Sequence, residues 1–205
     1  MGEQGQVLIS YDASSLVIDK LCDRARERHA TVACFYFDFA ARKEQSPMNA
    51  LGAVLRQVVE WLEEIPEEIT QAYNDHKRAL DGRGLQPPDI VKMLQSTVFE
   101  NPTFICIDGI DECLAKNRVE LLNSLNQILR RSPGTRVFMT GRPQIQAEVE
   151  RHLSGRAIAV RITPRRRDII SYLKYRLDED ATPEAMDSSL EADIMKRVPD
   201  DISEM

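Results

Sequence analysis

The chain has 205 residues, of which 42% are hydrophobic and 29% are charged, and its net charge is −6. This length allows one good-sized hydrophobic core or one and a half. The acidic balance argues against general nucleic-acid binding, and no apolar run approaches the ~20 residues that a membrane helix requires. The N-terminus lacks the basic and apolar segments of a signal peptide, and four cysteines without metal-ligand spacing are typical of free thiols in a reducing compartment. We therefore expect a cytoplasmic protein that binds neither nucleic acid nor membrane.

The first half of the chain predicts one strand among several helices. Ser46 and Pro47 indicate a helix start, because a capping hydroxyl precedes a proline at the first helical position. Apolar residues follow at helical spacing, and we expect Trp61 to join them in the core. The elements expected here are a helix from Ser14 or Ser15, a strand over 31–39, a helix from Pro47 that Pro66 ends, a more polar helix over 67–80 and a helix opening at Pro88.

The second half alternates strands with helices. Its expected elements are strands over 103–108, 136–140 and 157–162, helices over 119–129, from Pro143 and over 167–177, and a short helix near 190–197. Strands that alternate with helices indicate parallel βαβ units. The sequence therefore predicts an α/β fold, a three-layer parallel sheet with helices on both faces.

The most informative segment is T-F-I-C-I-D-G-I-D-E-C, residues 103–113. Its apolar run predicts a buried strand of a parallel sheet, and Asp108, Asp111 and Glu112 follow at the end where such sheets bind ligands. Three acids beside a buried strand are costly unless a cation lies there, and the usual cation is Mg²⁺ carrying nucleotide phosphates. The pattern is that of a Walker B segment. The alternative is a strand followed by a solvated acidic turn that caps the next helix.

A second segment, R-V-F-M-T-G-R-P over 136–143, follows one strand–helix unit later. Its strand ends in Thr140, and Arg142 comes just beyond. In a P-loop NTPase the strand beside the phosphate loop ends in a polar sensor, and a nearby arginine contacts phosphate. The alternative is a surface arginine in a strand-to-helix turn, because short motifs are weak alone. The spacing of the two segments supports the first interpretation.

Together, I-C-I-D-G-I-D-E-C and V-F-M-T-G-R-P resemble the NACHT branch of the STAND-type P-loop NTPases. The resemblance is greatest to the nephrocystin-like N-terminal NTPase modules of fungal ankyrin- or WD-repeat proteins. It extends over about residues 2–177, through A-C-F-Y-F-D-F, P-M-N-A-L-G-A-V-L-R-Q-V and I-T-P-R-R-R-D-I-I-S-Y-L. It implies that the partners are a nucleotide and the flanking effector and repeat domains of a full-length protein. It also implies that nucleotide exchange switches the module between closed and oligomeric states.

The resemblance also implies cofactors and site residues. ATP and Mg²⁺ are the cofactors of the family. Asp108 would be the metal-side acid, and Asp111 and Glu112 would position the attacking water. Thr140 and Arg142 would sense phosphate.

One part of the family pattern is missing, the phosphate loop G-x-x-x-x-G-K-S/T. Gly2 and Gly5 supply a G-x-x-G opening, but no G-K-S/T follows and no lysine precedes Lys20. In one interpretation these glycines begin a phosphate loop whose preceding strand is absent. In another, residues 7–11 are that strand, and the following turn, 12–15, has no glycine and places an acid where phosphate should bind. A flexible terminus is the plainest alternative.

We interpret residues 1–177 as a NACHT-like P-loop NTPase domain that lacks its first strand and G-K-S/T, and 178–205 as the start of a helical extension, incomplete at both ends. The expected function is a nucleotide-dependent signalling switch that has lost its phosphate loop. Two alternatives stay open: a non-enzymatic scaffold, and an unrelated Mg²⁺ enzyme that uses Asp108, Asp111 and Glu112. Whether the chain is an enzyme also stays open, and we expect no useful ATP hydrolysis without the lysine.

Overall fold

A computed structural model of the chain describes residues 6–10, 14–28, 30–78, 85–98, 102–153, 155–160, 165–179 and 187–203. The chain forms two compact units, Met1–Arg161 and Ile162–Met205. The boundary after residue 177 that the sequence suggested between the NTPase domain and its extension stays a prediction. Gly2 and Gly5 lie outside the described residues. Of the helices in the described ranges, none combines the length and the apolar character needed to cross a membrane.

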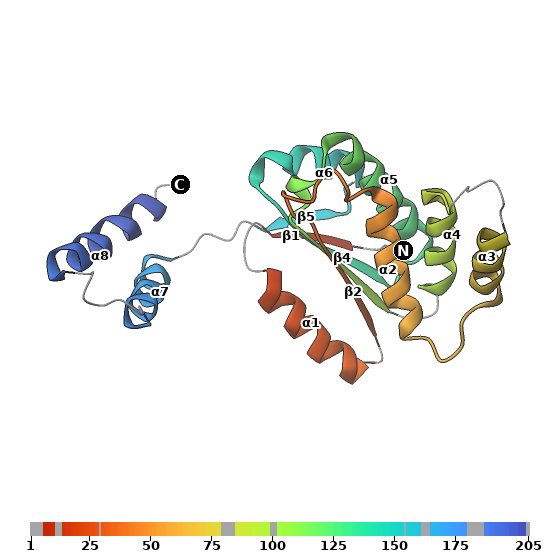
Figure 1. Cartoon of the computed structure of the whole chain (residues 1–205), viewed down its shortest axis with the longest axis horizontal. Helices are drawn as coiled ribbons and strands as arrows, with labels where there is room; N and C mark the ends of the chain where they lie inside the picture. The colour runs from red at the N-terminus through yellow and green to blue at the C-terminus, as the bar shows by residue number, and fades with distance from the viewer. Residues whose placement is uncertain are drawn as a thin grey trace. The chain divides into compact units, whose positions relative to one another are not determined.

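The first unit is built on a five-stranded sheet in which every neighbouring pair is parallel. The strands are β1 (Gln6–Ser10), β2 (Thr31–Tyr36), β3 (Thr103–Asp108), β4 (Thr135–Thr140) and β5 (Ala157–Val160). Their order across the sheet is β2-β3-β4-β1-β5 (Figure 1). Because all strands run the same way, their carboxyl ends share one edge, which we call the carboxyl edge.

Strand β1 settles the choice between the two interpretations of the N-terminal segment. It pairs with β4 on one side and β5 on the other, with Val7 opposite Val137 and Ala157. Val7 is buried. The prediction that the domain lacks its first strand is therefore wrong, because the short apolar run V-L-I fills the gap between β4 and β5.

Helices cover both faces of this sheet, as expected (Figure 1). The helix α1 (Ser14–Arg28) contacts β2 and β3 on one face. The other helices that pack on the sheet contribute residues to the larger hydrophobic core, which lies on the opposite face. The remaining helices of this unit are α2 (Pro47–Glu60), α3 (Glu67–Arg78), α4 (Pro87–Thr97), α5 (Ala115–Arg131) and α6 (Gln146–His152), with short 3-10 turns η1 (Ile110–Glu112) and η2 (Pro143–Ile145).

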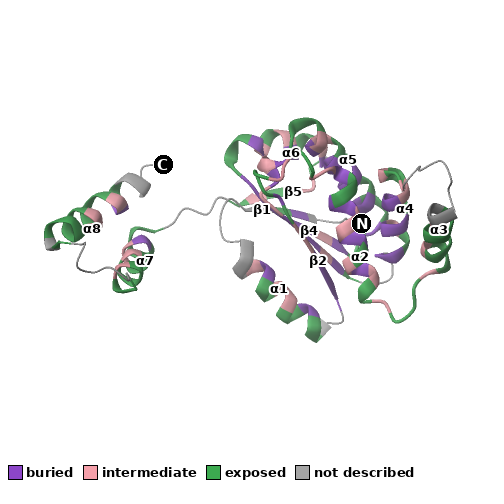
Figure 2. Cartoon of the chain, viewed as in Figure 1, coloured by how far each residue is buried: buried purple, intermediate pink, exposed green. Residues whose placement is uncertain are grey.

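The core explains the continuous apolar run of β3. Ile105 and Ile107 lie in a large cluster with residues of α2, α4, α5 and α6, whereas Cys106 lies in a smaller cluster with residues of α1. All three side chains are buried, and Figure 2 shows the inner strands of the sheet mainly in the colour of buried residues. A strand that is buried on both faces is apolar throughout and does not alternate between apolar and polar residues.

Helix α2 begins as the sequence predicts and corrects the prediction for Trp61. The Ser46 hydroxyl accepts a hydrogen bond from the Asn49 N–H at 3.2 Å, and Pro47 is the first helical residue. The helix ends at Glu60, and Trp61 is its C-cap. Trp61 is 54% exposed, because the chain turns away from the buried stripe of α2 before the indole could join it.

Two further boundaries differ from expectation. β2 ends at Tyr36 instead of reaching 39, because the Asp38 carboxylate accepts a hydrogen bond from the Ala40 N–H at 2.8 Å and closes a turn. The second unit contains α7 (Arg166–Asp178) and α8 (Ser188–Ser203), and α8 is longer than the helix expected near 190–197. An ion pair joins these two helices, with Arg166 Nε 3.2 Å from Asp200 Oδ1.

Candidate functional site

The carboxyl ends of β3 and β4 are joined by polar side chains. Asp108 ends β3 and Thr140 ends β4. The Thr140 hydroxyl donates a hydrogen bond to Asp108 Oδ1, and its oxygen accepts one from the Gly109 N–H at 3.0 Å. Thr140 is buried, so this hydroxyl fixes the position of the Asp108 carboxylate with little competition from water.

The turn after β3 brings a second acid to the same edge. Gly109 has φ +64°, a left-handed conformation that suits glycine and directs the chain into η1. Asp111 in η1 accepts a hydrogen bond from the Arg142 N–H at 3.2 Å and lies 3.4 Å from Arg142 Nε. The Asp111 side chain is only 9% exposed, whereas that of Arg142 is 71% exposed. Asp111 is therefore held from the β4 side, and the arginine head remains in solvent.

Gly141 makes this approach of η1 and the β4 end sterically feasible. A Cβ at this position would lie 2.9 Å from Ile145 Cδ1, 3.1 Å from Ile110 Cγ2 and 3.3 Å from Asp111 Oδ1. Real Cβ atoms essentially never come as close as 2.9 Å, so the end of the Ile145 side chain would have to shift to admit one. The glycine in T-G-R-P thus allows η1 to lie against the residues that follow β4, a role that the sequence analysis missed.

A buried arginine supports η1 from behind. Arg118 of α5 donates to the backbone oxygens of Asp111 and Cys113 at 3.3 and 2.9 Å. Its guanidinium also pairs with Glu148 of α6, with Nη2 2.8 Å from Oε2 and Nε 3.2 Å from both carboxylate oxygens. Their side chains are 11% and 25% exposed. Sequence analysis missed this pair, since the spacing of these two residues gives no signal that their helices meet.

Tyr36 is the other neighbour of Asp108. The two residues are register partners at the ends of β2 and β3, and Tyr36 is half exposed. Burial raises the pKa of the Tyr36 phenol, and nearby Cys34 and Asp108 raise it further. The phenol therefore stays protonated beside the carboxylate and can donate a hydrogen bond at this edge.

The structure thus brings together most of the predicted site residues. Asp108, Asp111, Thr140 and Arg142 lie at one place on the carboxyl edge, linked by the bonds described above. Glu112 belongs to the same 3-10 turn as Asp111. The geometry agrees with the placement expected for a Walker B strand and its neighbour, while the chemical roles of these residues stay predictions.

The residues at the carboxyl edge fit the metal side of a Mg²⁺-nucleotide site but not its phosphate side. No group of three or more Asp, Glu, His or Cys residues in the described part of the chain could hold a metal ion. A single carboxylate such as Asp108 suffices for Mg²⁺ only when phosphate oxygens and water complete its shell. The connection from β1 to α1 has only three residues, 11–13, which read Y-D-A and include neither glycine nor lysine. The residues present therefore do not fit the phosphates.

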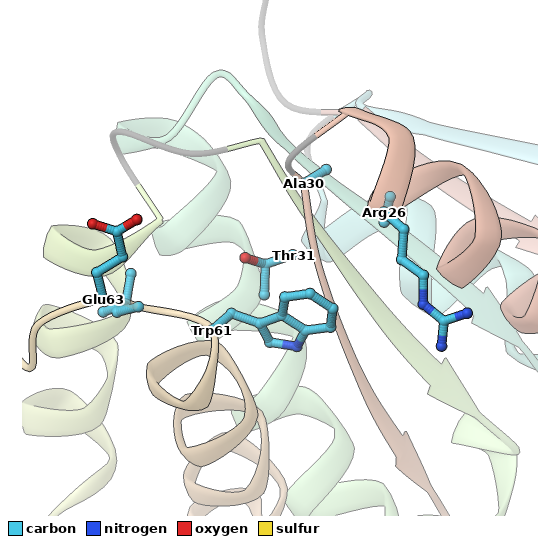
Figure 3. A pocket seen from close by; sticks show the side chains of 7 residues that line it. Arg26, Ala30, Thr31, Trp61 and Glu63 are labelled. Atoms are coloured by element: carbon cyan, nitrogen blue, oxygen red, sulfur yellow. The ribbon is translucent and has the colours of Figure 1, made fainter.

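A cavity of about 400 Å³ lies at the opposite edge of the sheet. Thr31, the first residue of β2, lines it together with Trp61, and Figure 3 shows the indole beside this threonine. Arg26 and Glu63 also line it and extend away on either side. Because Thr31 begins β2 and Asp108 ends β3, this cavity is separate from the acidic site.

Comparison with known protein families identifies the family to which this chain belongs. The family described as nephrocystin 3, N-terminal, matches residues 13–142, more than half of the 205 residues. The chain belongs to the nephrocystin 3 N-terminal family. The matched region begins just before α1 and ends at Arg142, so it includes every described residue of the acidic site.

Solved structures place this nephrocystin 3 N-terminal chain in the P-loop ATPase fold. It is similar to the Aeropyrum pernix ORC1 protein, solved in complex with DNA, with a TM-score of 0.50 and 17% identity over 86% of this chain and 44% of that one. It is also similar to Cdc6p from Pyrobaculum aerophilum, with a TM-score of 0.50 and 11% identity over 85% of this chain and 44% of that one. The chain spans less than half the length of either protein. No match was found among curated proteins.

Proposed function

We propose that this chain is the nucleotide-binding core of a NACHT-type signalling switch, in a form that has lost its phosphate-binding loop. The observation that supports this most is the joined ends of β3 and β4, where Asp108, Thr140, Asp111 and Arg142 meet. Ligands of open α/β sheets bind outside the carboxyl ends of the strands. The neighbouring strand β1 holds the position from which a phosphate loop would start.

The same arrangement explains why we expect neither tight nucleotide binding nor hydrolysis by the present chain. A phosphate loop supplies backbone N–H groups, a lysine charge and a metal-side hydroxyl. The three residues between β1 and α1 carry an acid instead. Removal of one preorganised electrostatic contact typically lowers a rate by ~10²–10³, and several are missing here. We propose Asp108 as the metal-side acid, Asp111 and Glu112 as water-positioning residues and Thr140 and Arg142 as phosphate sensors of the intact form.

A paired titration tests the proposal. The present chain is compared with a variant in which residues 11–13 are replaced by a G-x-x-G-x-G-K-S loop, and with the same variant carrying alanine for the new lysine. We expect Mg-ATP binding, measured by calorimetry, only in the first variant. Thermal unfolding of all three chains establishes that each is folded. Micromolar Mg-ATP binding by the present chain would contradict the proposal and indicate a different phosphate site.

The second candidate function is a non-enzymatic scaffold. It is favoured by the internal partners of both acids, since Asp108 accepts from Thr140 and Asp111 pairs with Arg142 without any ligand. Such partners reduce the cost of keeping these carboxylates at the edge. If the loop variant folds and still binds no Mg-ATP, the scaffold is the better account.

A further inference from the structure

Three of the four cysteines lie on the α1 side of the sheet, in or against the smaller core cluster. Cys22 is on α1, Cys34 on β2 and Cys106 on β3. Cys34 and Cys106 are register partners on neighbouring parallel strands. Neighbouring strands lie ~4.8 Å apart, which falls within the ~4.4–6.8 Å between Cα atoms that a disulfide requires. Their side chains share one face, so the two thiols face each other.

The two thiols differ in exposure. Cys34 is partly exposed and Cys106 is buried. Hydrogen bonding with the neighbouring thiol lowers the pKa of Cys34, although burial opposes the shift. Because peroxide in solution reaches the partly exposed thiol first, Cys34 is the attacking group and Cys106 is the thiol held beside it.

The backbone of Cys34 is also held in place from the outer side of the sheet. The Gln57 side chain of α2 accepts a hydrogen bond from the Cys34 N–H at 2.9 Å and donates one to its carbonyl oxygen at 2.8 Å. This amide takes the place of a further strand at the edge of the sheet. Cys34 therefore has a fixed backbone position opposite Cys106.

We propose that Cys34 and Cys106 form a redox-active dithiol that hydrogen peroxide converts to a disulfide between β2 and β3. The Cys34 thiolate attacks one peroxide oxygen, the O–O bond breaks, and the released hydroxide takes a proton to become water. The Cys106 sulfur then attacks the sulfenic sulfur of Cys34. The S–O bond breaks, and the hydroxide that leaves takes the Cys106 proton. Two thiols lose two electrons in total, and one peroxide becomes two waters.

The disulfide would act close to the acidic site. The pair lies two positions before Tyr36 and Asp108, which are themselves register partners. The bond would therefore tie β2 to β3 just before these two residues. The inference is independent of nucleotide binding.

Thiol counting on the full chain tests the inference. Reduced protein is treated with hydrogen peroxide, denatured, alkylated with N-ethylmaleimide and weighed intact. We expect two of the four thiols to be lost, together with two hydrogen atoms in mass, and both to return after dithiothreitol. Peptide mapping should place the bond between Cys34 and Cys106. A Cys113→Ser variant is the matched control, because Cys113 is a buried thiol in the other core cluster, and it should lose the same two thiols.

Two variants separate the proposed pair from other chemistry. Cys34→Ser should lose no thiols at the peroxide dose that oxidises the native chain. Cys106→Ala, whose folding is checked by circular dichroism, should retain a Cys34 sulfenic acid that dimedone labels; if it does not fold, Cys34→Ser alone decides. The proposal is overturned by a disulfide between Cys22 and Cys34, by retention of all thiols, or by conversion of Cys34 in the native chain to sulfinic acid.

Discussion

At the carboxyl edge, the ends of β3 and β4 differ from the end of β1. On the β3–β4 side Asp108 and Asp111 both have protein partners, since Thr140 donates to Asp108 and Arg142 pairs with Asp111. On the β1 side three residues without glycine or lysine lead into α1. The acidic side is maintained by side chains that bind one another, whereas a phosphate site depends on backbone donors that only a suitable loop presents. The acidic side therefore has its partners within the chain, while the three residues after β1 include neither the glycine nor the lysine of a phosphate loop.

The largest effect is expected when the support of the acidic side is removed. Arg118→Met leaves Glu148 without its partner and takes donors from the Asp111 and Cys113 carbonyls. Breaking a buried pair typically costs about 3 kcal/mol. Urea unfolding should show this as a lower midpoint with an unchanged slope.

A double variant identifies the source of that loss. Arg118→Met with Glu148→Leu removes both charges, so most of the lost stability should return if the unpaired carboxylate is the main cost. A double variant as unstable as the single one would assign the loss to the two carbonyl contacts of Arg118 instead.

The next largest loss of stability is expected for Thr140 of β4, and Thr135 of the same strand serves as its control. Thr140→Val removes the donor to Asp108 and the acceptor of the Gly109 N–H, which should cost about 2 kcal/mol. Thr135, at the other end of the strand, is fully buried, and within the described chain its hydroxyl has no hydrogen-bond partner. Thr135→Val should therefore leave stability unchanged or raise it by about 1 kcal/mol. Equal losses from both, in thermal melts, would show that the Thr140 bonds contribute nothing specific.

Much of the fold could be predicted from the sequence because its strands are buried and its helix starts are marked. The apolar run of β3 and the following acids indicated a central strand and its ligand edge, and the structure has β3 and β4 as inner strands. Ser46 and Pro47 marked the start of α2 correctly. These signals are local, so they can be recognised in the sequence without any knowledge of tertiary contacts.

The missed features depend on contacts between distant segments. The pairing of Arg118 with Glu148 needs α5 and α6 to meet, and Gly141 matters only because η1 approaches it. β1 was uncertain because five residues are a weak pattern until β4 and β5 flank them. Trp61 was misplaced because the helix ends one residue before it.

The smallest effect on stability concerns Arg142, whose side chain at the acidic site is 71% exposed. Its Nε lies 3.4 Å from Asp111, but the arginine is mostly in solvent and its backbone N–H keeps its own bond to the same carboxylate. Arg142→Ala should therefore lower stability by no more than about 0.5 kcal/mol, and less at high salt. Arg56→Ala is the matched control, since it removes an exposed pair with Glu60 on α2.

Once a phosphate loop is present, the Arg142 and Arg56 variants should differ in their affinity for Mg-ATP. In the loop variant, Arg142→Ala should weaken Mg-ATP binding about tenfold, the value of one charge-assisted hydrogen bond, whereas Arg56→Ala should leave it unchanged. Calorimetric titration of both variants measures the difference. Equal affinities would remove Arg142 from the proposed phosphate sensors and leave it only as the partner that holds Asp111 on the acidic side.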